Sequence, residues 1–164
     1  MILHGYFRSG AAYRVRIGLN LKGVPVEHVS HHLRHGEQHR DGYMALNPQG
    51  LVPSLVLDDG TVLTQSLAIL QWLDETYPDP PFVPGSPLER ARIRAFALAI
   101  GCDVHPVQNL KVLKRIKAMG HSEEEVNEWA QWVNREGLAA CEKLLAGTSG
   151  PFCFGPAPTL ADIM

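Results

Sequence analysis

Residues 6–23 read YFRSGAAYRVRIGLNLKG, and this stretch joins a short apolar segment to a longer helical one. Residues 2–4 favour a strand, and residues 11–22 are of types that favour a helix. Gly23-Val24-Pro25 supplies the signal that ends a helix. Arg8-Ser9-Gly10 stands at the joint, where unpaired backbone N–H groups of a helix favour negative charge. The stretch therefore predicts a strand–helix unit with an anion site between its two parts.

Further strand signals follow within the first eighty residues. Residues 26–29 predict a second strand, parallel to the first if the intervening helix is a crossover. Residues 55–57 and 61–63 flank the turn Asp58-Asp59-Gly60, which is a strong hairpin pattern. Residues 65–76 predict a helix with one apolar face. Together these signals predict a mixed four-stranded sheet with helices packed against it.

A proline-rich segment divides the chain. We expect an α/β domain over 1–78, a linker over 79–87 and an all-α domain over 88–164. In the last part, apolar residues recur at three- and four-residue intervals and predict that this part is helical throughout. These residues are Ile93, Phe96, Ala97, Ile100, Val104 and Val107, and then Val126, Trp129, Ala130, Val133, Gly137, Ala140 and Leu144.

The last residues predict another helix start. Thr159 and Asp162 have the spacing of a capping box, and the sequence ends at Met164, one turn later. Because so short a helix has no stability alone, we expect the helical domain to be incomplete here.

Composition narrows the possible functions. The 164 residues are 45% apolar and 20% charged, with a net charge of -2, so no general attraction to nucleic acid or membrane is expected. No apolar run is long enough to span a bilayer, and no signal peptide is visible. Three scattered cysteines argue against a disulfide framework and a structural zinc site, so we expect a cytoplasmic protein.

The domain pattern resembles the cytosolic glutathione transferases. Residues 8–23, RSGAAYRVRIGLNLKG, resemble the zeta-class signature of that family. Three more blocks agree, ALNPQGLVPSL at 45–55, TQSLAILQWLDE at 64–75 and GCDVHPVQNLKVL at 101–113. The last block looks like the bacterial maleylacetoacetate and maleylpyruvate isomerases of the class. The resemblance implies a thioredoxin-like N-terminal domain, a helical C-terminal domain and a homodimer.

The resemblance gives Ser9 a catalytic role, because it implies that the anion at the helix start is the thiolate of bound glutathione. Lowering a thiol pKa from about 8.5 to about 6.5 requires roughly 2.7 kcal/mol. One hydrogen bond to a charged group gives about 1.5–3 kcal/mol, and a helix end adds about 0.3–1 kcal/mol. The alternative is that Ser9 only caps the helix.

Other positions of the first domain match glutathione contacts of the family. Gly10 lets the backbone approach a ligand, and Val52-Pro53 matches the cis-proline site that presents the Val52 backbone. Gln65-Ser66 matches the pair that binds the γ-glutamyl end. Gln38 and Gln49 match positions at the glycine end, with surface solvation as the alternative.

The helical domain adds fewer candidates. His105 and Asn109 match residues that approach glutathione, although His105 could equally be a buried structural histidine. The implied substrate is a dianionic maleyl keto acid, and Arg8 and Lys111 would bind its carboxylates. In the implied reaction the thiolate adds to the cis double bond, the resulting single bond rotates, and elimination gives the trans fumaryl product.

Two alternative functions remain. A general glutathione transferase would conjugate electrophiles or reduce peroxides without a cationic substrate site, and a non-catalytic protein would keep only the fold. Five histidines, His28, His31, His32, His35 and His39, raise the possibility of a metal site, but their spacing matches no standard ligand set. We expect a solvated loop there, and core or interface packing for Trp72, Trp129 and Trp132.

Overall fold

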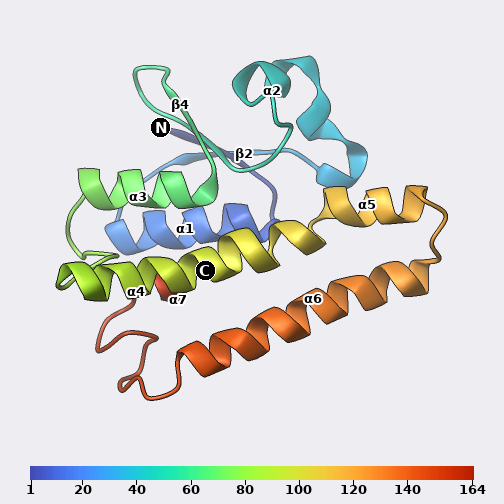
Figure 1. Ribbon diagram of the computed structural model, residues 1–164. Helices are drawn as coiled ribbons and strands as arrows, with labels where there is room; N and C mark the ends of the chain where they lie inside the picture. Colours follow the sequence, from blue (N-terminus) through green and yellow to red (C-terminus); the bar gives the residue numbers. More distant parts are fainter. The chain divides into compact units, whose positions relative to one another are not determined.

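The computed structural model describes residues 1–164 as two compact units, Met1–Pro81 and Phe82–Asp162 (Figure 1). The division falls inside the segment 79–87 that the sequence marks as a linker. None of the helices has both the length and the apolar character that a membrane crossing requires.

The first unit is built on a sheet of four strands in the order β2-β1-β3-β4. β1 pairs in parallel with β2, with Ile2 opposite Glu27, and antiparallel with β3, with Leu3 opposite Leu55. β3 and β4 form the predicted hairpin. The mixed sheet is thereby confirmed, with strands at Ile2–Gly5 (β1), Glu27–Ser30 (β2), Ser54–Val56 (β3) and Val62–Thr64 (β4).

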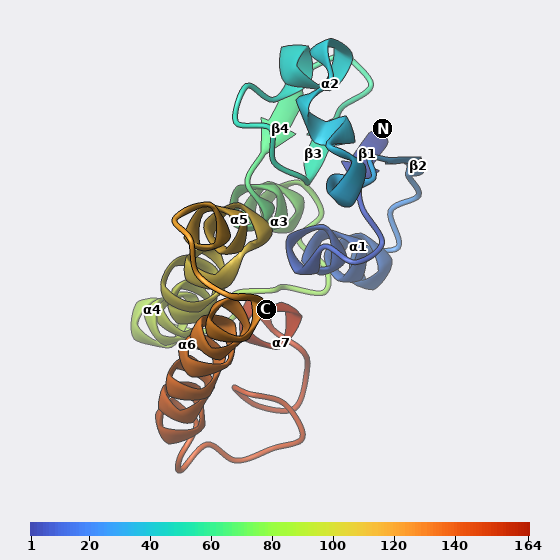
Figure 2. The same ribbon diagram turned by 90° about the vertical axis from the view of Figure 1, so that its right-hand side faces the viewer.

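Helices cover both faces of this sheet. α1 and α3 lie together on one face, and α2 lies on the other with two 3-10 turns (Figures 1 and 2). The four buried residues of α3 are Ser66, Ile69, Leu70 and Leu73, the apolar face that the sequence predicts. The bounds are Gly10–Lys22 (α1), Leu33–His35 (η1), Glu37–His39 (η2), Asp41–Leu46 (α2) and Ser66–Thr76 (α3).

The second unit is helical. Ser86 and Glu89 form a capping box at the start of α4, and Thr159 and Asp162 form the predicted one at α7. The backbone N–H of Leu160 donates to the carbonyl of Phe82 at 2.7 Å, which ties the end of the unit to its beginning. The elements are Pro87–Leu98 (α4), Ala99–Val104 (η3), Pro106–Gln108 (η4), Leu110–Ala118 (α5), Glu123–Leu144 (α6) and Leu160–Ile163 (α7).

Residues 93–107 are helical, as predicted, but they do not form one regular α-helix. α4 continues as a π-helix, η3, and the N–H of His105 donates to the carbonyl of Ile100, five residues earlier, at 2.9 Å. A 3-10 turn follows at Pro106. Proline has no backbone N–H and its ring clashes with the preceding turn, so α geometry does not pass through this point.

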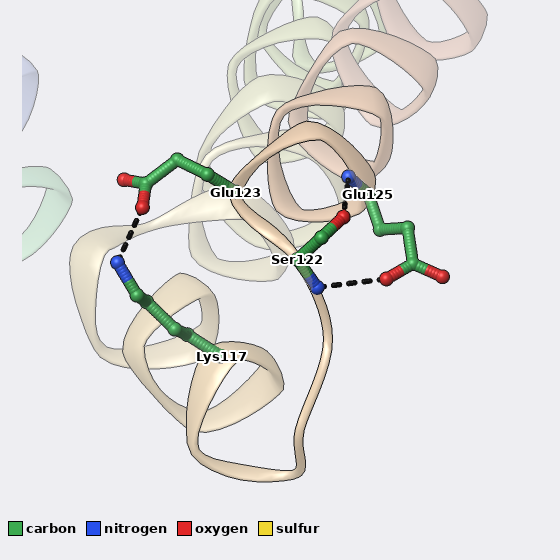
Figure 3. Close-up of polar contacts among 4 residues, drawn as sticks. All are labelled: Lys117, Ser122, Glu123 and Glu125. Carbon is green, nitrogen blue, oxygen red and sulfur yellow. Dashed lines mark hydrogen bonds and ion pairs between the residues drawn. The ribbon is translucent and has the colours of Figure 1, made fainter.

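The turn between α5 and α6 is fixed by polar contacts that the sequence analysis did not identify (Figure 3). The Ser122 N–H donates to Glu125 Oε2 at 2.7 Å, and the Glu125 N–H donates to Ser122 Oγ at 3.2 Å. Lys117 forms an ion pair with Glu123 beside this capping box. The three acidic residues in the first turn of α6 also suit the positive end of the helix dipole.

The predicted apolar stripe of α6 is only partly buried. Val126 and Val133 are buried, but Ala140 is exposed and Leu144 is 58% exposed, whereas Cys141 is buried instead. Trp132, expected in a core or interface, is 54% exposed. α6 packs against η3, η4 and α5, and the predicted stripe is exposed at its C-terminal positions.

α6 approaches η3 at Gly137. A Cβ atom placed there would lie 2.2 Å from Cγ2 of Val104. Alanine raises helix propensity by about 1 kcal/mol over glycine, but overpacking costs about 1–3 kcal/mol, and a contact this short forces the Val104 side chain or the backbone to shift. We expect Gly137→Ala to lower the free energy of unfolding by about 1–2 kcal/mol in urea denaturation. The control is Gly42→Ala in α2, where a Cβ meets no atom within 4 Å, and equal stability losses would contradict the packing argument.

Candidate active site

Ser9 lies where the sequence places it, directly before α1. Its side-chain oxygen accepts a hydrogen bond from the N–H of Ala12 at 3.2 Å, so Ser9 is the N-cap of the helix. The residue is half-buried, and its own N–H donates to the carbonyl of Tyr6 at 2.9 Å. The hydroxyl hydrogen is not needed for the cap, because the cap uses the oxygen as acceptor. Capping and donation to an anion are therefore compatible roles for this one group.

Arg8 and Gly10 flank Ser9, and both are exposed. No acidic side chain pairs with Arg8. A cavity of about 270 Å³ also opens near the start of α1, but its lining includes Arg16 and His28 and neither Ser9 nor Arg8. An unpaired guanidinium next to a helix start makes this end of α1 electropositive.

Val52 presents free backbone groups. Neither its N–H nor its carbonyl takes part in a hydrogen bond within the chain, although the residue is buried. The Val52-Pro53 peptide bond is cis, as expected, and Asp79-Pro80 is a second cis bond that the sequence analysis missed. Buried backbone groups are nearly always paired in proteins, so a free donor and acceptor at one residue indicate a place for a ligand or water.

Gln49 and Gln65 come together across the sheet edge. Gln65 Nε2 donates to Gln49 Oε1 at 2.9 Å, and both side chains are exposed. Gln65 has φ 68°, an unusual value for a residue other than glycine, and the buried Ser66 follows it as the first residue of α3. The side chain of Gln65 therefore lies beside the unpaired N–H groups at the start of that helix.

Gln38 is not a solvated surface residue. It is 6% exposed, and its Oε1 is buried without a hydrogen-bond partner. The alternative of surface solvation is therefore wrong for Gln38, whereas Gln49 is exposed. The segment that holds Gln38 is also more ordered than the expected loop, because residues 33–39 form the turns η1 and η2.

A polar network that the sequence analysis missed holds the loop before Val52. The Tyr43 hydroxyl donates to the Leu51 carbonyl at 2.5 Å and contacts Ser54 Oγ at 2.9 Å. Asn47 Nδ2 donates to the same carbonyl at 2.7 Å. Burial raises the pKa of Tyr43, and its contacts with Ser54 and Asn47 oppose that rise. Tyr6, Tyr43 and Val52 also share one apolar cluster, so α2 positions the Val52 backbone.

The five histidines differ in their exposure to solvent. His28, His35 and His39 are exposed, while His31 and His32 are half-buried. His31 Nε2 lies 2.9 Å from Nδ1 of His4, and burial lowers the pKa of both rings, with the neighbouring imidazole a further cause for His4. No group of three or more His, Cys, Asp or Glu side chains is arranged to hold a metal ion.

The remaining candidates lie in the second unit. His105 is half-buried at the junction of η3 and η4. Asn109 is the N-cap of α5, and its Oδ1 accepts from the Val112 N–H at 3.2 Å. Lys111 is exposed in the first turn of α5 and pairs with no carboxylate. Lys111 is therefore accessible to an anion, and the Nδ2 of Asn109 remains available beside it.

Comparisons with known proteins agree with this geometry. The family described as "Glutathione S-transferase, N-terminal domain" matches residues 3–81. The maleylacetoacetate isomerase of Pseudomonas aeruginosa is 48% identical over 99% of this chain and 77% of its own length. The maleylpyruvate isomerase of a Ralstonia species is 46% identical over the same shares.

Comparison with solved structures indicates the same family. A holo maleylpyruvate isomerase, described as a bacterial glutathione S-transferase in the zeta class, superposes with a TM-score of 0.95 at 44% identity, covering 99% of this chain and 78% of that one. The maleylacetoacetate isomerase of Methylobacterium extorquens, with bound malonate and glutathione, also gives 0.95, at 41% identity and the same shares. The chain therefore belongs to the zeta class of glutathione S-transferases, in the family of the maleylacetoacetate and maleylpyruvate isomerases.

Proposed function

We propose that this protein is a glutathione-dependent cis–trans isomerase of a maleyl keto acid, maleylacetoacetate or maleylpyruvate. The observation that carries the proposal is the half-buried Ser9 at the start of α1, next to the unpaired guanidinium of Arg8. The similarity to isomerases over 99% of the chain supports it further. The dicarboxylate malonate bound to one structural relative agrees with a dianionic substrate.

The chain's own groups fit glutathione. The free N–H and carbonyl of Val52 match the donor and acceptor of a peptide backbone. Gln65 and Ser66 at the start of α3 suit the carboxylate of the γ-glutamyl end. Gln49, bonded to Gln65, and the buried Gln38 supply amides for the glycine end. These residues would hold the tripeptide with its sulfur directed to Ser9 and Gly10.

When bound, glutathione supplies a thiolate, a nucleophile that adds reversibly to an activated carbon–carbon double bond. Ser9 donates its hydroxyl hydrogen to the negative charge, and the N-terminus of α1 stabilises that charge further. Arg8 binds a carboxylate of the substrate through two N–H groups and stabilises charge that develops on the neighbouring carbonyl oxygen. The family resemblance further assigns Lys111 to the substrate carboxylates, and His105 and Asn109 to the tripeptide.

Substrate selectivity tests this proposal against a general glutathione transferase. The isomerase should turn over maleylpyruvate or maleylacetoacetate at least about 100-fold more efficiently than a neutral aryl halide, because only the dianion uses the two cations. Faster conjugation of the aryl halide would replace the proposed function with the general one. The homodimer and the cytoplasmic location expected from the resemblance stay predictions.

Arg8→Ala should raise the KM for the maleyl substrate about tenfold, because a charged hydrogen bond is worth roughly 1.5–3 kcal/mol. The KM for glutathione should stay unchanged, since Arg8 is assigned to the carboxylate of the substrate. Arg8→Lys keeps the charge without the paired donors, so its KM for the maleyl substrate should lie between those of the parent and Arg8→Ala. Steady-state kinetics with each substrate varied in turn gives both KM values for the parent and for each variant. An unchanged substrate KM in Arg8→Ala would remove Arg8 from the site.

A further inference from the structure

Two histidines, one in β1 and one directly after β2, meet on the α2 side of the sheet. His4 of β1 and His31, directly after β2, have Nδ1 and Nε2 2.9 Å apart, and their rings stack with centroids 5.2 Å apart. In such a contact one nitrogen donates its hydrogen and the other must offer a lone pair. Counted from two neutral rings, the contact therefore tolerates one added proton, and a second added proton would break it because both rings would then be donors only.

The pair touches the part of the first unit that carries the proposed glutathione contacts. The His31 ring packs on Tyr43 with centroids 4.4 Å apart, and His4 packs on it at 5.9 Å. The Tyr43 hydroxyl in turn bonds the carbonyl of Leu51, the residue before Val52. His31 also leads directly into η1 and η2, where Gln38 lies.

We propose that the His4–His31 pair is a positioning element of the glutathione site, and that a second proton on the pair weakens glutathione binding. This inference rests on the proposed function. With at most one proton, the pair fixes Tyr43 and the chain after β2, so Val52 and Gln38 are held for the ligand. With two protons, repulsion separates the rings and loosens both segments at once.

The surrounding charges act in opposite directions. His4 faces His31 from the adjacent strand and Tyr43 from α2. His31 also feels Glu37 of η2, whose charge favours its protonation, and Arg40, whose charge opposes it. Burial outweighs the effect of Glu37 and lowers the pKa of His31. Both histidines thus bind protons less readily in the fold than in the unfolded chain, whose imidazole pKa is about 6.5. The contact is therefore intact near pH 7.5, and it is lost only when the pH falls below the lowered pKa values and both rings are protonated.

Calorimetry with S-methylglutathione tests this inference, because that ligand has no thiol to titrate. In the parent, the Kd should rise about tenfold between pH 7.5 and pH 5.0, which corresponds to a difference of about one unit in the lower apparent pKa of the pair between the free and the bound protein. In His31→Gln, which keeps a hydrogen-bonding amide without the charge, the rise should be less than about twofold. His28→Gln removes an exposed histidine of β2 and should behave as the parent.

Equal pH dependence in the parent and His31→Gln would overturn the inference, and so would a pH-independent Kd in the parent. No binding by the parent at pH 7.5 would instead overturn the proposed function, and the inference with it. His4→Gln gives a second variant if His31→Gln does not fold.

A measurement on the parent alone also tests the inference. The pair has two apparent pKa values, and nitrogen NMR of the imidazole rings measures both. Saturation with S-methylglutathione should reduce the smaller of the two by about one unit, because coupling between two binding equilibria is reciprocal. Unchanged titration curves for both rings would contradict the inference.

Discussion

Ser9→Ala should lower kcat for isomerisation roughly 20-fold at pH 7, because a thiol is mostly ionised at a pKa of about 6.5 and only about 3% ionised at a pKa of about 8.5. This is the largest loss of activity that we expect from one substitution. The hydroxyl is the group assigned to the thiolate, and moving a thiol pKa from about 8.5 to about 6.5 corresponds to roughly 2.7 kcal/mol. Without the hydroxyl, α1 still offers its N-terminus, which is worth about 0.3–1 kcal/mol. The ultraviolet absorbance of bound thiolate against pH should show the thiol pKa returning toward its solution value.

Loss of the helix cap must be separated from loss of the anion donor. Ser9 accepts from the Ala12 N–H, so alanine there should also cost about 1 kcal/mol of stability. Ser86→Ala removes a cap of the same kind from α4 and should leave kcat unchanged. Ser9→Thr keeps the hydroxyl and should retain most of the activity. Equal kcat values for Ser9→Ala and the parent at pH 7 would remove Ser9 from the mechanism.

Lys22→Met should lower the free energy of unfolding by about 3 kcal/mol, the largest loss of stability that we expect from one charge. Lys22 Nζ donates to Asp74 Oδ1 at 2.7 Å and to the Pro80 carbonyl at 2.6 Å. Its side chain is 0% exposed and that of Asp74 is 18% exposed, so solvent screens this pair weakly. One lysine thereby ties the end of α1 to α3 and to the segment after it.

Urea denaturation measures this loss against a matched pair. Arg40 and Glu37 form an ion pair at 3.4 Å in which the Arg40 side chain is exposed, so Arg40→Met should cost less than about 0.5 kcal/mol. Lys22→Met combined with Asp74→Leu should recover part of the stability, because no unmatched carboxylate then remains. Equal losses from Lys22→Met and Arg40→Met would contradict the assignment of a structural role to the buried pair.

Local patterns in the sequence were sufficient for much of the fold. The turn Asp58-Asp59-Gly60 fixed the β3–β4 hairpin, and the spacing of Ser66, Ile69, Leu70 and Leu73 fixed the inner face of α3. Gly23 ends α1 with φ 65°, a conformation that glycine adopts without strain. Each of these features depends on neighbours within a few residues, so a single sequence contains its signal.

Contacts between distant segments were not predicted. The burial of Gln38 and the meeting of His4 with His31 depend on how η1 and η2 pack on the sheet, and no residue spacing encodes that. The same holds for Lys22, which is 52 residues from Asp74. The place of Ser9 at the start of α1 was predicted because a helix start has a local signal, whereas Tyr43 acts through a carbonyl eight residues away.

The central claim is that catalysis requires the sulfur of glutathione, and the dependence of turnover on the thiol tests it most directly. Isomerisation of maleylpyruvate and maleylacetoacetate should be followed with glutathione, without it, and with S-methylglutathione in its place. We predict product only with glutathione, and inhibition when S-methylglutathione is added as a competitor. Equal turnover without glutathione, or with the methylated tripeptide alone, would contradict the account.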